Sequence, residues 1–82
     1  MKRLVLKNNV YGFRKRNKLT QKHLAELVGT SRETIGYIEK GDFHTASVKL
    51  CLLIAIALDC DINDIFWLEV EEYEEKKSRS KM

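Results

Sequence analysis

The chain has 82 residues, of which 44% are hydrophobic and 33% charged, with no proline and a formal net charge of +3. This composition favours a compact helical domain over a disordered chain, and the length limits the chain to one small domain that buries only about 60 to 65% of its unfolded surface. The longest apolar run, LCLLIAIAL at 50–58, is too short to cross a membrane, and MKRLVLKNN lacks a signal-peptide core. We therefore expect a cytoplasmic protein. Its two cysteines, Cys51 and Cys60, stand too far apart along a helical pattern to form a disulfide, so we expect both to stay reduced.

Charge is divided unevenly along the chain. Residues 1–40 hold ten Lys or Arg against three Glu, residues 41–75 hold one Lys against nine acids, and residues 76–82 hold four bases. The basic N-terminal part indicates affinity for a polyanion such as nucleic acid, and the acidic part indicates a different task. Ordinary solvated charge is the alternative interpretation, and only a motif can decide between the two.

The first predicted helix covers VYGFRKRN at 10–17. Asn8 and Asn9 stand before it, and either side chain can cap its first turn. Val10 and Phe13 mark its apolar side, and most of the remaining surface is basic. The weakly alternating LVL at 4–6 precedes it.

The segment LTQKHLAELVGTSRETIGYIEKG at 19–41 predicts two helices joined by a short turn. Thr20 caps the first helix, Ala25 is small enough for two helices to cross, and Gly29 supplies the positive φ that a sharp turn needs. Ile35 and Ile38 stand three positions apart and face inward from the second helix. This is helix-turn-helix geometry.

Ser31 is expected to cap the second of these helices, and polar side chains follow at its open end. A helix start carries free amide donors and partial positive charge, so it accepts a phosphate nearby while its first side chains reach base edges. We interpret Arg32, Glu33 and Thr34 as such a reading head. An ordinary helical hairpin with a solvated second helix is the alternative.

Residues 8–66 resemble the Cro/repressor (XRE) class of helix-turn-helix regulators. The resemblance is carried by Arg14, LTQKHLAELVG, TSRETI, IEKG at 38–41 and DINDIFWLE at 61–69. It implies an all-α, five-helix, lambda-repressor-like DNA-binding domain. It also implies that Arg14 forms a partly buried ion pair with Glu39, although an exposed Arg14 that touches phosphate is the alternative.

The base-reading positions of the family match Arg32, Glu33 and Tyr37. Arginine suits a bidentate contact to guanine, glutamate accepts from cytosine N4, and the methyl group of Thr34 can meet a thymine methyl. The residues expected to contact DNA phosphates, or to add charge beside them, are Gln21, Lys22, Ser31 and Lys40. A solvated side chain is the alternative at each of these positions.

Two segments depart from the family pattern. The loop GDFHTASVKL at 41–50 has no proline, so we assign no phosphate contact to His44 or Thr45. Lys18 stands where the family favours glycine, so we expect Asn17 or Lys18 to adopt the left-handed backbone conformation at some strain.

The fourth predicted helix, VKLCLLIAIAL at 48–58, is capped by Ser47 and is apolar nearly all round. One stripe suits the domain core and comprises Leu50, Cys51, Ile54, Ala55 and Leu58. A domain this small has little with which to cover the other side, so we expect a second copy of the chain to do so. The predicted dimer interface comprises Leu52, Leu53, Ile56 and Trp67.

The C-terminal part allows two readings. After a short helix begun by Asp61, FWLEV at 66–70 can pair with RLVL at 3–6 as a two-stranded β-ribbon. The alternative is a helix that continues through EVEEYEEKKSRSKM at 69–82. We expect one helix-turn-helix domain over residues 1–70 and a charged, frayed tail over 71–82.

These features predict a nucleoid-associated, sequence-specific transcriptional regulator, a repressor that binds a palindromic operator as a homodimer. The helix at 32–39 is expected in the major groove, with its two-fold-related copy about 34 to 36 Å away. Two alternatives remain: the antitoxin of a toxin–antitoxin pair that autoregulates its operon, and a protein-binding adaptor on the same fold. We expect no catalysis, cofactor or metal, because no catalytic triad, metal-spaced cluster or phosphate-binding loop is present in the sequence.

Overall fold

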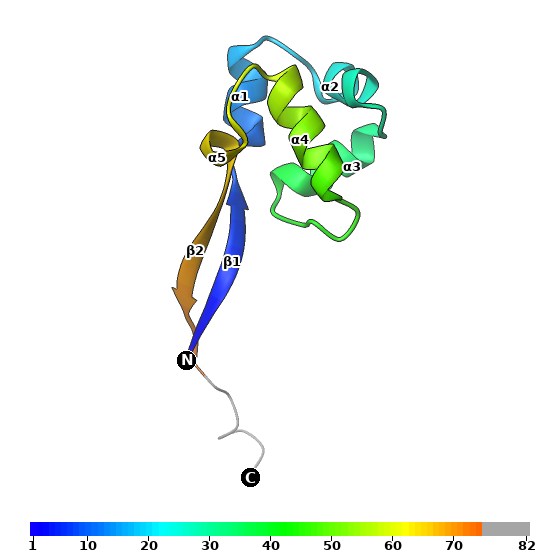
Figure 1. Ribbon diagram of the computed structural model, residues 1–82. Helices are drawn as coiled ribbons and strands as arrows, with labels where there is room; N and C mark the ends of the chain where they lie inside the picture. The colour runs from blue at the N-terminus through cyan, green and yellow to red at the C-terminus, as the bar shows by residue number, and fades with distance from the viewer. Residues whose placement is uncertain (75–82) are drawn as a thin grey trace.

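A computed structural model describes residues 1–74 and shows a helical bundle from which a two-stranded ribbon projects (Figure 1). In chain order the elements are β1 (Lys2–Asn8), α1 (Val10–Arg16), α2 (Gln21–Val28), α3 (Arg32–Glu39), α4 (Val48–Ala57), α5 (Ile62–Ile65) and β2 (Phe66–Glu72). This arrangement confirms the predicted five-helix domain with a ribbon built from the two ends of the chain. No helix within the described range has the length and apolar character that a membrane crossing requires.

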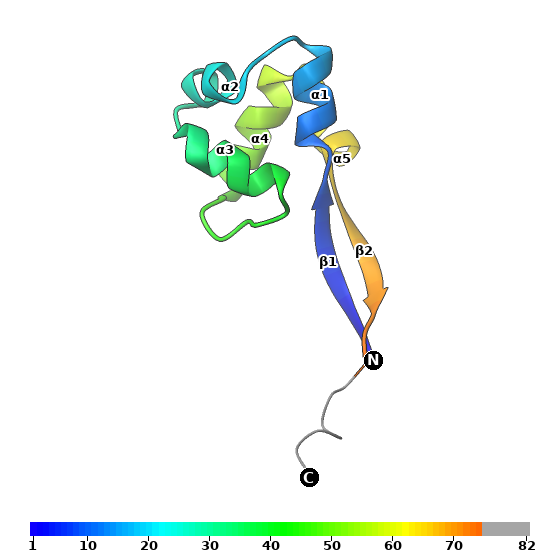
Figure 2. The ribbon, with the colours of Figure 1, turned by 180° about the vertical axis from the view of Figure 1, so that it is seen from behind.

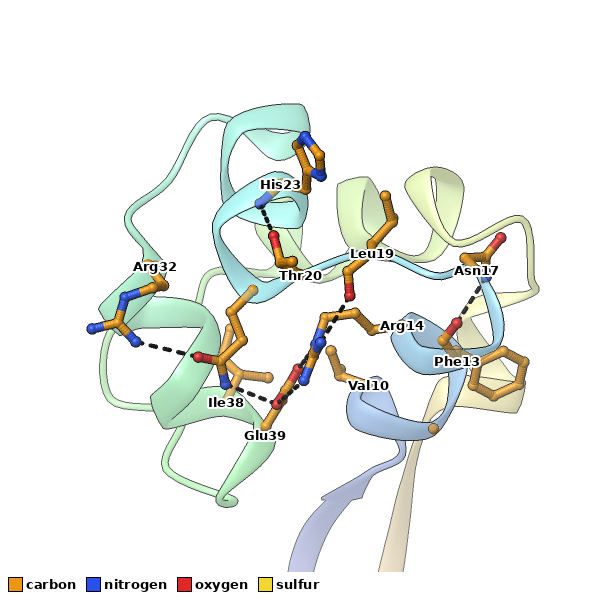
Figure 3. Close-up of polar contacts among 12 residues, drawn as sticks. Val10, Phe13, Arg14, Asn17, Leu19, Thr20, His23, Arg32, Ile38 and Glu39 are labelled. Carbon is orange, nitrogen blue, oxygen red and sulfur yellow. Dashed lines mark hydrogen bonds and ion pairs between the residues drawn. The ribbon is translucent and has the colours of Figure 1, made fainter.

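Side-chain caps explain where the four longer helices begin. Asn9 Oδ1 accepts from the amide of Gly12 at 3.2 Å, and Thr20 Oγ1 accepts from the amide of His23 at 3.0 Å (Figure 3). Ser31 and Ser47 cap α3 and α4 in the same way, with N–O distances of 3.1 and 3.0 Å. Each cap satisfies one of the amide donors that a helix start leaves free.

The core lies between α2, α3 and α4 and is closed by α1 and α5. It holds fully buried aliphatic side chains from every helix, chiefly Val10, Leu24, Ile35, Ile38, Ile54 and Ile65. Figure 2 shows α4 in the middle of the bundle, with α2 and α3 on one side of it and α1 on the other. Such a position explains why α4 presents apolar side chains in several directions.

The outer side of α4 differs from our expectation at one residue. Leu52 and Ile56 are 45% and 75% exposed, as a helix side without intramolecular cover should be. Leu53, however, is only partly exposed and packs against the core. The predicted core stripe is therefore too narrow, because neighbouring helices contact α4 from more than one direction.

The ribbon is antiparallel, and its register pairs Leu4 with Val70 and Leu6 with Leu68. A helix continuing through the acidic segment is therefore wrong. β2 ends at Glu72, and the amide of Tyr73 donates to the carbonyl of Met1 at 2.9 Å. Residues 71–74 of the expected tail thus belong to or follow the ribbon, and the rest of that tail lies outside the described residues.

Four residues within the described range have positive φ: Lys18, Gly29, Gly41 and Asp59. Gly29 ends α2 with φ of 77°. Of the two candidates before α2, Lys18 adopts the left-handed backbone conformation, with φ of 59°, whereas Asn17 has φ of −85°. The side-chain amide of Asn17 instead donates to the carbonyls of Phe13 and Leu58, at 2.8 and 3.2 Å, which fixes the end of α1 against the end of α4.

Candidate nucleic-acid interface

The helix pair α2 and α3 is held by a small set of buried residues around a tight turn. Ala25 is 2% exposed where the two helices meet, and its carbonyl accepts from the amide of Thr30 at 2.9 Å. Ile35 and Ile38 are fully buried on the inner side of α3. These buried contacts fix the position of α3 and leave the side chains on its outer side free for other contacts.

The N-terminal end of α3 is open to solvent. The side chains of Arg32 and Glu33 are 56% and 66% exposed, and their charged groups lie 3.8 Å apart. Tyr37, one turn further on, is 43% exposed. Thr34 is partly buried, and its hydroxyl is engaged by Ser31 at 3.0 Å, so its methyl group is the part left for an outside contact.

Five of the residues expected to contact DNA line one shallow hollow of about 260 Å³. It is formed by Gln21, Arg32, Glu33, Gly36, Tyr37 and Lys40. The structure therefore brings together residues from α2, residues from α3, and Lys40, which directly follows α3. Lys22 and Ser31 are exposed but do not line the hollow, and neither does Thr34.

Gln21 links the start of α3 to its end. Arg32 Nη1 donates to Gln21 Oε1 at 3.3 Å, and Gln21 Nε2 donates to Glu39 Oε1 at 3.0 Å. The side-chain amide of Gln21 thus connects Arg32 to Glu39 across the hollow. Gly36 lies beside Gln21, and a Cβ there would make an ordinary contact 3.8 Å from Gln21 Nε2.

Glu39 is held in turn by Arg14 from α1. Arg14 Nε lies 2.6 Å from Glu39 Oε2, and Nη2 lies 3.2 Å from Oε1 (Figure 3). Arg14 Nη1 donates to the carbonyl of Leu19 at 2.8 Å, and the two side chains are 9% and 7% exposed. The pair is bidentate and buried, so the guanidinium of Arg14 is not accessible to a DNA phosphate.

The loop after α3 contributes a contact that the sequence pattern did not reveal. The rings of Tyr37 and His44 meet edge to face with centroids 5.3 Å apart. His44 Nδ1 lies 2.6 Å from Asp42 Oδ1, and hydrogen bonds from His44 lower the pKa of the Asp42 carboxyl. The Asp-x-His spacing was the available signal, since Asp side chains often bind the backbone two residues on.

Nothing in the described range suggests a metal centre. Within residues 1–74, no three His, Cys, Asp or Glu side chains gather closely enough to hold a metal ion. Both cysteines are free thiols, and burial raises the pKa of Cys51 and of Cys60. Thiols with a raised pKa are poor nucleophiles at neutral pH.

Comparison with known proteins identifies the family of the chain. A family model described as helix-turn-helix matches residues 11–65, which span α1 to α5. The chain is 42% identical over 66 residues to an HTH-type transcriptional regulator, YgzD, of Bacillus subtilis, covering 80% of this chain and 98% of that protein.

Archaeal relatives match over a similar extent. An HTH-type transcriptional regulator of Archaeoglobus fulgidus is 39% identical over 72 residues, covering 88% of this chain and all (100%) of that protein. One from Methanocaldococcus jannaschii is 42% identical over 67 residues, covering 82% and 100%. The chain belongs to the XRE-type helix-turn-helix family of DNA-binding transcriptional regulators.

Proposed function

We propose that this protein is a sequence-specific repressor that binds a palindromic operator as a homodimer, with α3 in the major groove. The observation that carries the proposal is the hollow at the start of α3. Its charged and aromatic side chains face solvent, while the residues behind them are fully buried. A reading head needs this combination of accessible donors and a rigid support.

The roles of the exposed residues follow from their chemistry. Arg32 has five N–H donors, of which Gln21 accepts one, so a bidentate contact to guanine O6 and N7 remains open to it. Glu33 accepts from cytosine N4, and the methyl group of Thr34 meets a thymine methyl. Tyr37 reads one turn further along, steadied by the ring of His44.

Phosphate contacts come from the rim of the same surface. Lys22 and Lys40 are exposed on either side of it and add attraction that is independent of sequence. Gln21 has a second amide hydrogen that its bond to Glu39 leaves free, and the hydroxyl of Ser31 lies at the positive end of α3. These four residues set the position of α3 on the duplex.

A homodimer follows from the size of the reading head. One α3 presents only three or four base-reading side chains, so it specifies only a few base pairs. Two copies related by a two-fold axis double the contacts and match a palindrome with half-site centres about 34 to 36 Å apart. Repression then requires nothing more than occupancy of the operator.

The antitoxin alternative receives less support from the structure. It needs an acidic surface that is free to mask a basic partner. In the ribbon, Glu71 instead lies 3.2 Å from Arg3 and 3.4 Å from Lys7, both on β1. Because the chain's own bases already neutralise part of this surface, we favour the DNA-binding regulator.

Selection of bound sites from random duplex DNA tests the proposal directly. We expect enrichment of a two-fold symmetric motif whose half-site centres lie about 10 to 10.5 base pairs apart. The matched control is the Arg32→Ala/Glu33→Ala variant, which changes only exposed side chains and should bind DNA without enriching a motif. The proposal fails if the wild-type protein also enriches none and shows a shallow dependence of affinity on salt.

A further inference from the structure

The ribbon has one apolar face that its own chain does not cover within residues 1–74. Side chains of the even-numbered residues share this face: the cross-strand pair Leu4 and Val70, nearer the bundle Leu6 and Leu68, and at the far end the oppositely charged pair Lys2 and Glu72. Leu4, Leu68 and Val70 are 66%, 61% and 63% exposed. Figure 1 shows why: the ribbon points away from the helices, and the described residues measure 51 Å along their longest axis.

An apolar hollow lies where this face meets the helices. It has a volume of about 240 Å³ and is lined by Leu6, Phe43, Ala46, Ser47, Val48, Cys51, Ile62 and Phe66. Leu6 and Phe66 belong to the same face of the ribbon as Leu4 and Val70. Val48, at the rim, is 77% exposed. The hollow and the ribbon face therefore form one continuous apolar surface, which is concave where it meets the bundle.

This surface needs a cover to be stable. An isolated two-stranded ribbon is at best marginally stable in water, because only one side of each strand has a partner. Residues 75–82, EKKSRSKM, contain a single apolar side chain and offer little apolar surface to it. Another molecule with a matching apolar shape can supply the cover.

The charges of the ribbon indicate how two copies fit. β1 carries Lys2, Arg3 and Lys7, whereas β2 carries Glu69, Glu71 and Glu72. Joining either strand edge to edge with its own copy about a two-fold axis would set like charges against each other, which is unfavourable. The ion pairs of Arg3 and Lys7 with Glu71 lie on the other face, so packing the apolar faces together leaves them intact.

We propose that a second copy of this chain covers this surface, with the two ribbons packed face to face about a two-fold axis. In this arrangement Leu4 and Val70 of each ribbon lie over the hollow of the partner, so the same two parts of each chain form both halves of the contact. The inference rests on the proposed function for the need of a dimer. It assigns the dimer contact to the ribbon and the hollow instead of to the outer side of α4 around Ile56.

Sedimentation velocity across a range of concentrations tests the assignment. The main variant is Leu4→Lys/Val70→Glu, which makes the face polar but places opposite charges on a directly paired position, so the ribbon itself is preserved. Val48→Glu changes the rim of the hollow without touching the ribbon, at an exposed first helix position where an acid is tolerated. Each variant should raise the dimer dissociation constant about 100-fold or more.

Two matched controls replace equally exposed apolar residues elsewhere. Leu27→Lys on α2 and Ile56→Lys near the end of α4 alter side chains that are 63% and 75% exposed, and both variants should remain dimeric. Circular dichroism melts recorded alongside show that each variant is folded. Wild-type protein that stays monomeric at its highest soluble concentration overturns the proposal. So do dimeric Leu4→Lys/Val70→Glu and Val48→Glu variants, or loss of the dimer in Ile56→Lys alone.

Binding to a single half-site separates this inference from the proposed function. Monomeric variants with an intact α3 should bind a duplex carrying one half-site as tightly as one wild-type subunit does, but should lose the added affinity for the full palindrome. A wild-type dimer that depends on Leu4, Val70 and Val48 but enriches no DNA motif would support the interface and refute the regulator.

Discussion

Arg14 and Glu39 form a bidentate ion pair between α1 and the last turn of α3, with the shorter contact at 2.6 Å. The pair is nearly excluded from solvent, and Glu39 also accepts from Gln21, so its two oxygens together accept three hydrogen bonds. Buried pairs of this kind do not add much stability in themselves, but they are costly to break. The pair therefore fixes where α3 ends relative to α1.

Removal of one partner should therefore be strongly destabilising. We expect Arg14→Ala or Glu39→Ala to lower the free energy of unfolding by about 3 to 5 kcal/mol, because each leaves an unpaired charge in the interior. The double variant Arg14→Met/Glu39→Leu should recover most of the loss, and Lys15→Ala, on the exposed side of α1, should change little. Urea titrations measure all four. If the double variant loses as much unfolding free energy as the two single variants together, the two residues act independently.

The amide of Gln21 should sharpen base discrimination by holding Arg32. In Gln21→Ala, Arg32 loses its acceptor at 3.3 Å and gains rotamer freedom that binding must remove again. We expect discrimination at the base pair that Arg32 reads to fall by about 1 kcal/mol, the typical net contribution of one hydrogen bond. Competition titrations against operators altered at that base pair provide the measurement. Uniform weakening on all sequences would instead place Gln21 solely on phosphate.

Arg32 and Lys22 should differ in the kind of affinity they supply. We expect Arg32→Ala to lose about 1 to 3 kcal/mol at one base pair and to relax specificity there. Lys22→Ala should weaken binding to every sequence alike. It should also reduce the slope of log affinity against log salt concentration by about 1. Titrations of both variants at several salt concentrations compare them directly. If Arg32→Ala weakens all sequences equally, Arg32 is not a base-reading residue.

Local spacing predicts the scaffold well. The caps Thr20 and Ser31, the small Ala25 and the positive φ at Gly29 are each fixed by interactions within a few residues, and the structure shows them where the pattern indicates. These features depend on local backbone geometry that residue type constrains. The ribbon is less predictable, because weak alternation at both ends permits strands but leaves a helix at 69–82 as an alternative.

Contacts between elements are harder to predict from sequence. The bond between Arg32 and Gln21 depends on how closely α2 approaches α3, and the contact of His44 with Tyr37 depends on the path of a loop without proline. The inward position of Leu53 depends on how many neighbours α4 has. Spacing along one helix carries no information on any of these distances.

Acid should loosen the ribbon. Hydrogen bonds from Arg3, and secondarily from Lys7, lower the pKa of Glu71 below its usual value of 4.5. A carboxyl group whose pKa is lowered on folding stabilises the fold above its unfolded pKa, and this contribution is lost as the pH falls through the folded pKa. Met1 and Tyr73 form a hydrogen-bonded pair at the end of the ladder, so the alternation of an antiparallel ladder makes Val5 and Glu69 a hydrogen-bonded pair as well. We expect amide exchange at Val5 and Glu69 to accelerate, relative to amides of α4, as the pH falls below about 4.5.

The variant Glu71→Gln is the matched control for this effect. It keeps a side chain of similar size and removes the titrating group, so the pH dependence of ribbon exchange should flatten. The core amides of α4 serve as the internal reference, because no ion pair of the ribbon touches them. A ribbon in Glu71→Gln that loosens in acid as much as wild type would assign the effect to another carboxylate, with Glu69 and Glu72 the first to be replaced.

Gly29 and Gly36 offer the same substitution in two backbone environments. At Gly29 an added Cβ would meet nothing within 4 Å, so Gly29→Ala measures only the strain of φ at 77°, and we expect a loss of about 1 to 2 kcal/mol. Gly36 lies inside α3, where a Cβ makes ordinary contact 3.8 Å from Gln21 Nε2. Gly36→Ala should therefore gain about 0.5 to 1 kcal/mol from better helix propensity. Thermal unfolding of the two variants should shift in opposite directions, and a gain in Gly29→Ala would show that the turn tolerates a different backbone conformation.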